Sequence, residues 1–192
     1  MYKKYTIPLN LFLILENIKI IYYSTKLNNP NTIYIYIEKK NLFIFNKLLK
    51  NEFFTSYSTL LDASCVDTLF YNNFLFNSKN FFLKNRIIIF YIYYLYFLKI
   101  KLNLLIFYNN NNLYKLNSID LIYQNANWLE REFSEMFNIH FYFKKDIRKL
   151  LLNYSKNESP LLKDFPTEGY NDVFYNFFNE LIDLNNNNSV EL

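Results

Sequence analysis

Three carboxylates lie within six residues of this chain, and they are its first candidates for chemistry. Glu130, Glu132 and Glu135 fall in the stretch 125–137, whose apolar spacing predicts a helix. Neighbouring carboxylates can act as general acid and base where burial raises the pKa of one of them. No sequence feature indicates burial here, and Arg131 stands four residues before Glu135, the spacing of an ion pair along an exposed helix. The sequence therefore favours an ion-paired outer helix face over acid–base catalysis.

Side chains that usually hold metals, clusters or phosphates are scarce in the 192 residues. The single cysteine, Cys65, and the single histidine, His140, are too few for a structural zinc site or an iron–sulfur cluster. One glycine is too few for a phosphate-binding loop or a dinucleotide fingerprint. We therefore expect this chain to bind no metal, flavin or nucleotide, and a hydrolase would have only Cys65 and His140 to build on.

The helix predicted over 126–137 has two distinct faces. Its apolar face should pack on a sheet and consists of Leu129, Phe133, Met136 and Phe137. The opposite face carries the only tryptophan and most of the charges: Trp128, Arg131, Glu132 and Glu135. Asn127 is predicted as the N-cap, with Glu130 three residues later completing a capping box.

Hydrophobic patterns predict the remaining elements and an α+β fold. We expect helices over 9–21 and 42–50, strands over 32–37 and 102–108, a loop over 72–80 and a central strand over 86–98 that is covered on both faces. The resulting architecture is a two-layer sandwich, in which helices pack on a small mixed β-sheet. The run 87–98 is too short to span a bilayer, which takes ~20 apolar residues, so we predict no transmembrane segment.

The domain organisation follows from the two prolines and the glycine that come after the predicted helix. Residues 1–145 should form the α+β domain, and 146–184 an extended segment that is either a surface loop or an arm laid across a partner. Residues 185–192 should be a disordered, Asn-rich tail.

Composition indicates a strongly A/T-biased, organellar genome. Asn occurs 31 times, whereas Gly, Ala, Arg and Pro, which have G/C-rich codons, total ten. Six of these ten lie between positions 126 and 169: Ala126, Arg131, Arg148, Pro160, Pro166 and Gly169. We interpret this window as the part of the chain that resists the bias.

Two motifs in that window resemble a known family. The first is E-R-E-F-S-E-M-F at 130–137, followed by Lys144, Arg148, Leu150 and Leu151. The second is P-L-L-K-D-F-P at 160–166, reached without a gap from D-I-R-K-L-L-L-N-Y at 146–154. Together they resemble the 30 kDa subunit family of respiratory complex I, with a thinner likeness upstream at Asp67 and Arg86. The family's usual glycine after M-F is Asn138 here, and its usual arginine before K-D-F-P is Leu162.

The resemblance implies a structural subunit rather than a free enzyme. Members of this family carry no redox centre and pack on the large, 49 kDa-type quinone-module subunit in the matrix-side peripheral arm. Flavin mononucleotide, iron–sulfur clusters and ubiquinone belong to the assembly. The resemblance implies a peripheral location at the mitochondrial inner membrane and, with the codon bias, a gene in the mitochondrial genome.

We predict a subunit interface on the two motifs, without a role in nucleic-acid binding. Phe165 should anchor the arm and Asp164 should pair with a basic group of the partner, while Gly169 should adopt a positive φ. The full predicted interface is Trp128, Glu130, Arg131, Glu132, Glu135, Arg148, Pro160, Lys163, Asp164, Phe165, Pro166, Gly169 and Tyr170.

A structural protein of the organellar ribosome is the alternative. The formal net charge of +4 would suit it. Binding to phosphates favours a basic stripe rich in Arg, however, and this chain has three scattered Arg and a surplus of carboxylates in 101–192.

Overall fold

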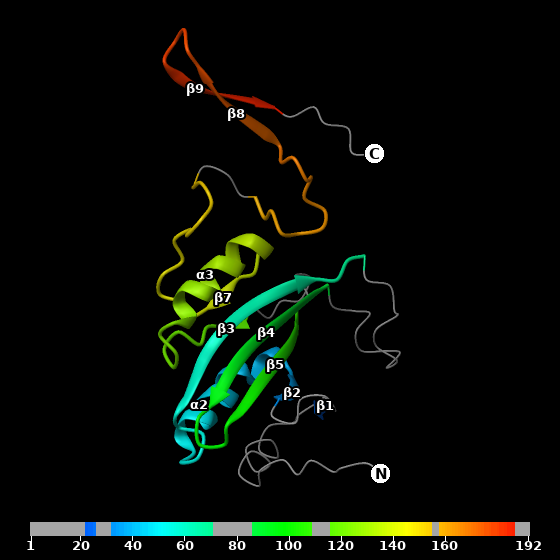
Figure 1. Cartoon of the computed structure of the whole chain (residues 1–192), viewed down its shortest axis with the longest axis vertical. Helices are drawn as coiled ribbons and strands as arrows, with labels where there is room; N and C mark the ends of the chain where they lie inside the picture. The colour runs from blue at the N-terminus through cyan, green and yellow to red at the C-terminus, as the bar shows by residue number, and fades with distance from the viewer. Residues whose placement is uncertain (1–21, 26–31, 71–85, 109–115, 155–157, 187–192) are drawn as a thin grey trace.

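A five-stranded mixed sheet forms one layer of the protein (Figure 1). The computed structural model describes residues 22–25, 32–70, 86–108, 116–154 and 158–186. The strands are β1 (Tyr22–Thr25), β2 (Thr32–Ile37), β3 (Ser58–Asp67), β4 (Ile87–Leu95) and β5 (Ile100–Tyr108), in the order β1-β2-β5-β4-β3. β2 and β5 run parallel and the other neighbours run antiparallel. The strands expected over 32–37 and 102–108 are confirmed.

Alternation along the strands decides which face of the sheet is covered. In β2, Ile33, Ile35 and Ile37 are buried and the residues between them are half-buried. β4 repeats this pattern over nine residues, with Tyr91 and Tyr93 fully buried. β4 is therefore an interior strand, as expected, and its second face, which was predicted to be covered, is half-buried. The A/T-rich codons place Ile, Phe and Tyr on both faces of β4, so its composition does not reveal which face packs.

Two helices form the second layer on the buried face. α2 (Leu42–Asn51) follows the 3₁₀ turn η1 (Lys39–Asn41) and buries Leu42, Phe45 and Leu49. α3 (Ala126–Phe137) buries Phe133 and Phe137 in the same core, and the ring of Phe133 meets the edge of Tyr91 from β4. Both helices confirm the sequence expectation. Among the described residues, no helix is long and apolar enough to span a membrane.

Two short strands and a hairpin complete the described chain. β6 (Leu116–Asn117) pairs in parallel with β7 (Phe141–Tyr142), which fixes the chain on either side of α3. β8 (Asn171–Asn176) and β9 (Leu181–Asn186) form an antiparallel hairpin that stands away from the sheet in Figure 1.

The C-terminal third therefore differs from an extended arm. Residues 143–154 and 158–170 are irregular and full of turns, and the hairpin follows them. Strand β9 includes 185 and 186, which the sequence pattern assigns to the disordered tail. The predicted helix 9–21 and loop 72–80 lie outside the described residues.

Candidate functional site

Glu130 is a buried carboxylate at the centre of helix α3. Its side chain has no solvent exposure, and its carboxylate accepts hydrogen bonds from Ser118 Oγ at 2.5 Å and the Ile119 backbone N–H at 2.9 Å. Lys144 Nζ lies 3.0 Å from the same carboxylate and also donates to the Asn127 carbonyl at 3.1 Å. Burial raises the pKa of Glu130, although Lys144 and the two hydrogen-bond donors oppose that shift.

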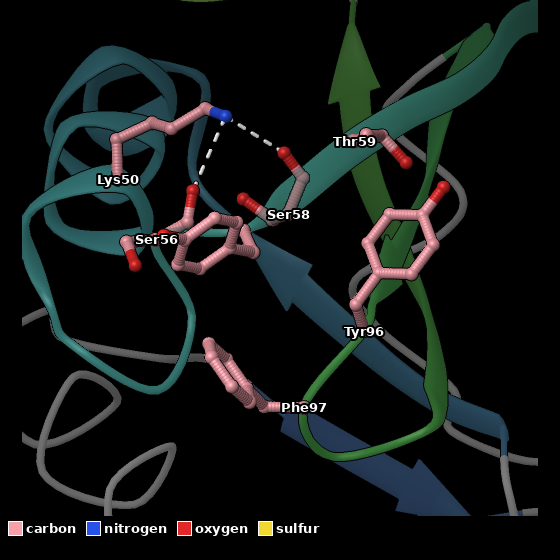
Figure 2. A pocket seen from close by; sticks show the side chains of 7 residues that line it. Lys50, Ser56, Ser58, Thr59, Tyr96 and Phe97 are labelled. Carbon is pink, nitrogen blue, oxygen red and sulfur yellow. Dashed lines mark hydrogen bonds between the residues drawn. The ribbon is translucent and has the colours of Figure 1, made fainter.

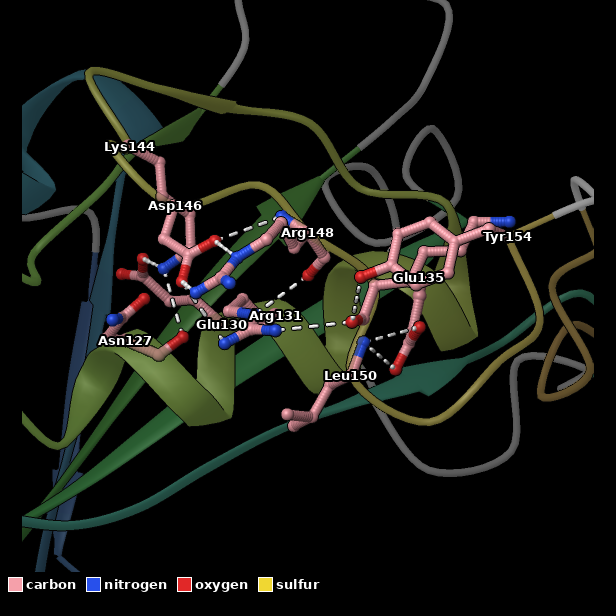
Figure 3. A network of polar contacts seen from close by, with 10 residues as sticks. Asn127, Glu130, Arg131, Glu135, Lys144, Asp146, Arg148, Leu150 and Tyr154 are labelled. Carbon is pink, nitrogen blue, oxygen red and sulfur yellow. Dashed lines mark hydrogen bonds and ion pairs between the residues drawn. The ribbon is translucent and has the colours of Figure 1, made fainter.

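The predicted roles of Glu130 and Asn127 are wrong. α3 begins at Ala126, so its N-cap is Asn125, and Asn127 lies inside the first turn. Glu130 points into the protein instead of back to a capping position (Figure 3). Its oxygens are bound to Ser118, Ile119 and Lys144, so Glu130 links helix α3 to the segments before and after it. No position on the carboxylate is left open for a substrate.

Arg131 holds the segment that follows α3. Its guanidinium donates to the carbonyls of Arg148 at 2.8 Å and Lys149 at 3.2 Å and pairs with Asp146 at 3.3 Å, and its side chain is only 10% exposed. Asp146 also pairs with Arg148 at 2.9 Å, and the hydrogen bonds from Arg148 hold the pKa of Asp146 well below its usual range. The ion pair that the sequence predicted between Arg131 and Glu135 is not the one that forms.

Glu135 binds backbone instead. Its carboxylate accepts hydrogen bonds from the N–H groups of Leu150, Leu151 and Leu152, the shortest being 2.7 Å, to Leu151. Figure 3 shows the contact with Leu150. A carboxylate that accepts several backbone N–H groups fixes a turn without regular secondary structure. Arg131 and Glu135 together therefore determine the path of residues 146–152.

Helix α3 and the segment 143–154 present large apolar side chains to solvent. Phe143 and Ile147 are each 79% exposed, and Leu151, Tyr154 and Trp128 are all more than 60% exposed. Phe143 also has φ 59°, a left-handed backbone conformation that is strained for a bulky residue. We name these five residues the signature face. Its polar neighbours are bound internally while its apolar side chains are uncovered.

A second polar cluster ties residues 163–164 to the sheet. Arg86 binds the buried carboxylate of Asp67 with a shortest distance of 2.8 Å and also pairs with Asp164. The Lys163 N–H donates to Asp67 at 3.0 Å. Burial alone would raise the pKa of Asp67, but hydrogen bonds from Arg86, Lys163 and Leu69 lower it below its ordinary value.

Residues 158–170 therefore pack on this chain's own domain. The Leu161 N–H donates to the carbonyl of Met136 in α3 at 3.2 Å. Phe165 is partly buried and meets the edge of the Tyr170 ring at a centroid distance of 5.1 Å. Within this chain Asp164 pairs with Arg86, and the expected pairing with a basic group of another subunit stays a prediction. Gly169 has φ +75°, as expected.

The structure divides the predicted interface residues into two groups. The first group lies on α3 and on the segment that follows it: Trp128, Glu130, Arg131, Glu132, Glu135 and Arg148. In this group Trp128, Glu132 and Arg148 are exposed, whereas Glu130 is buried. The second group belongs to the irregular segment 158–170, in which Lys163 and Asp164 contact the Asp67–Arg86 pair. Its members are Pro160, Lys163, Asp164, Phe165, Pro166, Gly169 and Tyr170. Sequence reasoning missed Phe143 and Ile147, although apolar residues on either side of Lys144 and Lys145 were the signal that could have marked them.

The described part of the chain contains no group of three or more His, Cys, Asp or Glu side chains that could hold a metal ion. Cys65 is buried in the core, and burial raises the pKa of its thiol.

Comparisons with known proteins decide the family. A family model described as the 30 kDa subunit of the respiratory-chain NADH dehydrogenase matches residues 35–171. The chain belongs to this family. The match runs from the middle of β2 through β5 and includes both helices and both polar clusters, so the site described above is built from residues within it.

Individual relatives agree with the family. The chain is 31% identical to NADH-ubiquinone oxidoreductase subunit 9 of Paramecium primaurelia, over 98% of this chain and 88% of the relative. It is also 31% identical to NADH-ubiquinone oxidoreductase subunit 9 of Dictyostelium citrinum, over 73% of this chain and 63% of that one. A chain of the membrane-bound sulfane sulfur reductase, an archaeal respiratory membrane complex, shares the fold with a TM-score of 0.59 at 17% identity, over 81% of this chain and 83% of that one.

This 30 kDa-type chain is accordingly a subunit of respiratory complex I, with other complex I subunits as its partners. The assignment replaces the ribosomal alternative, whose basis was charge and composition alone.

Proposed function

We propose that this chain is a non-redox structural subunit that packs on the large quinone-module subunit through the signature face. It would stand in the matrix-side peripheral arm at the mitochondrial inner membrane, encoded by the mitochondrial genome. The chain itself would bind no metal, flavin or nucleotide and would hold no catalytic centre. NADH oxidation and the reduction of ubiquinone would then be activities of the assembly.

The observation that carries this proposal is the arrangement of the family motif in space. Arg131 and Glu135 direct their hydrogen bonds to the backbone of 148–152, and the result is an irregular segment with uncovered Ile147 and Leu151. Exposed apolar side chains that cluster on a fixed backbone are typical of protein interfaces. The strained backbone of Phe143 is a further cost that docking of its side chain would offset.

Arg148 gives the signature face its polar rim. Its side chain is 74% exposed, and Asp146 orients the guanidinium through two hydrogen bonds of 3.0 and 2.9 Å. An oriented arginine is a frequent anchor at interfaces because its planar group binds carboxylates in a fixed geometry. The partner surface should therefore offer an apolar groove with a carboxylate near Arg148.

The test is incorporation of an Ile147→Ser variant into complex I. Because Ile147 is 79% exposed, the purified variant should unfold at nearly the same temperature as the wild type. Its incorporation, measured by native gel electrophoresis and in-gel NADH dehydrogenase activity, should fall at least tenfold, which corresponds to about 1.4 kcal/mol of binding.

A matched control separates docking from general exposure. Leu121→Ser removes an apolar side chain that is 61% exposed and lies outside the signature face. It should leave incorporation unchanged. Normal incorporation of Ile147→Ser, or a cross-link from position 147 to a subunit other than the large quinone-module one, would contradict the proposal.

A further inference from the structure

Exposed aromatic side chains gather at the end of the sheet opposite the Asp67–Arg86 cluster. They come from two turns, the connection between α2 and β3 and the turn between β4 and β5. We name them the aromatic cup: Phe53, Phe54, Tyr57, Tyr96 and Phe97, which are 72%, 46%, 65%, 54% and 54% exposed. The cup lies at the Ser58 end of strand β3, and Asp67 lies at the other end. The nine residue steps between them span roughly 30 Å.

Three rings of the cup, those of Tyr57, Tyr96 and Phe97, line a hollow, and Phe53 and Phe54 pack beside them. Phe97 lies edge-on to Tyr57 with centroids 5.1 Å apart and stacks near Phe53 at 6.1 Å. The hollow has a volume of about 470 Å³, and Figure 2 shows Phe97 and Tyr96 facing it from the β4–β5 turn. The five side chains together expose on the order of 500 Å², the range in which apolar patches of soluble proteins are often functional.

Lys50 forms one wall of the hollow and keeps it in shape. Its ammonium donates to the carbonyl of Ser58 at 2.7 Å and lies 4.7 Å from the centre of the Tyr123 ring. Burial lowers the pKa of Lys50. Because this amine is bound to the α2–β3 connection and to the core, the wall is set before any partner arrives.

The charge around the cup is basic. The two stretches that build it, 47–59 and 94–101, contain four lysines and a single carboxylate, Glu52. Lys47, Lys99 and Lys101 are exposed. The hairpin end of the chain has the opposite character, since seven carboxylates and one lysine occur from Glu158 onward. Two surfaces of opposite charge at opposite ends of a subunit suit two different neighbours.

We propose that the aromatic cup is a second docking site, which receives an acidic segment of another complex I subunit with an apolar side chain in the hollow. Ring-lined hollows accept single protruding side chains, and such pockets concentrate the binding energy of protein interfaces. Carboxylates beside that side chain would meet Lys47, Lys99 and Lys101. The proposal rests on membership in complex I but is independent of the docking of the signature face.

A protein segment fits the cup better than a lipid surface does. Interfacial membrane anchors are typically amphipathic helices with one apolar face, whereas these rings come from two turns and three of them line a hollow. The polar groups in its wall, among them the Thr59 hydroxyl, also suit the mixed contacts of a polypeptide.

Zero-length cross-linking of intact complex I tests the proposal. A carbodiimide joins a lysine amine to a nearby carboxylate as an amide with loss of water, and mass spectrometry identifies both peptides. We expect Lys99 or Lys101 to be joined to an Asp or Glu of one other subunit, within a few residues of an apolar side chain. Lys145, beside the signature face, serves as the reference lysine and should react with a different peptide.

Substitutions supply the second measurement. Phe97→Ser and Lys101→Glu should each lower incorporation about tenfold, the effect of truncating a central interface contact. Val66→Ser, at the other end of β3 and 41% exposed, should change it less than about twofold.

Several results would overturn the proposal. One is that Lys99 and Lys101 form cross-links only within the chain or to a second copy of it. Another is that they form no cross-link although Lys145 does. A third is normal incorporation of both Phe97→Ser and Lys101→Glu. Phe97-dependent binding of the purified chain to vesicles with one-third anionic phospholipid would assign the cup to a membrane instead. If Lys99 is cross-linked to another subunit and Lys145 is not, only the docking of the signature face is contradicted.

Discussion

Single residues in this chain take their roles from partners that lie far away in sequence. Glu130 has the spacing of an outer helix residue, yet Ser118, twelve positions earlier, and Lys144, fourteen positions later, enclose it. A helical pattern reports only which residues share a face, and it cannot reveal that a lysine from outside the helix reaches the face's edge. For this reason the helix could be predicted from sequence, and the burial of Glu130 could not.

The Glu130–Lys144 pair gives the first prediction. Glu130→Gln should lower the free energy of unfolding by about 3–5 kcal/mol at pH 7, because it leaves the ammonium of Lys144 buried without a countercharge. Adding Lys144→Met should restore most of that loss, because it removes the buried ammonium that Glu130→Gln leaves without a countercharge. Urea unfolding of the wild type, both single variants and the double variant measures the coupling. Additive effects would show that the two side chains do not interact.

Phe143 gives the second prediction, because its backbone and side chain have opposite requirements. Its left-handed φ of 59° costs about 1 kcal/mol or more for a residue other than glycine, and its ring is 79% exposed. Phe143→Gly should therefore leave the melting temperature of the chain equal or slightly higher, while incorporation into complex I falls. Phe143→Ala serves as the control, because it removes the ring but keeps the strain. A clear loss of stability in the glycine variant would show that the ring packs on the chain itself.

At the scale of elements, local patterns predicted two helices and three strands but missed β1, β3 and the C-terminal hairpin. The helices 42–50 and 126–137 and the strand 32–37 follow from spacing within each segment. The hairpin β8–β9 was missed, although β-branched and aromatic residues on either side of F-F-N-E were a usable signal. Asn138 ends α3 with φ 54°, so it adopts the left-handed conformation for which the family usually has glycine.

The contact between β3 and residues 163–164 gives a pH-dependent prediction. The pKa of Asp67 is lowered in the folded protein, so its contribution to stability is complete above the unfolded pKa of about 3.9 and is lost as the pH falls through the folded value. The stability difference between wild type and Asp67→Asn should therefore shrink as the pH falls from about 6 to about 3. Urea unfolding at several pH values measures it. Glu130, whose pKa is raised, has the opposite dependence, but it is present in both proteins and cancels.

Asp62→Asn is the matched control for this pH dependence, because Asp62 is exposed on the same strand and lies outside the Asp67–Arg86 cluster. Its difference from the wild type should stay small at every pH. If Asp67→Asn and the wild type differ by the same amount over the whole acidic range, the carboxylate does not stabilise the fold through its charge.

At the scale of the whole molecule, the chain combines a packed domain with a hairpin that has little to pack on. The eight large apolar side chains of the hairpin are each at least 43% exposed: Val173, Phe174, Tyr175, Phe177, Phe178, Leu181, Ile182 and Leu184. An isolated two-stranded hairpin is marginally stable in water. Its carboxylates, Asp172, Glu180 and Asp183, have no lysine or arginine near them in sequence. The hairpin thus has the composition of a docking element for a basic, apolar surface.

Deletion of residues 171–192 tests this role, and the preceding segment supplies the comparison. The deletion should leave the melting temperature nearly unchanged, because the hairpin adds no buried side chains to the core, but it should abolish incorporation into complex I. A longer deletion, from residue 158 onward, should lower the melting temperature as well, since it removes the Lys163 N–H from Asp67 and the Asp164 carboxylate from Arg86. Salt should release the wild-type chain from the complex more readily than it unfolds the domain, because exposed charges are screened and the core is not. Equal incorporation of the hairpin deletion and the wild type would mean that the hairpin is dispensable for docking.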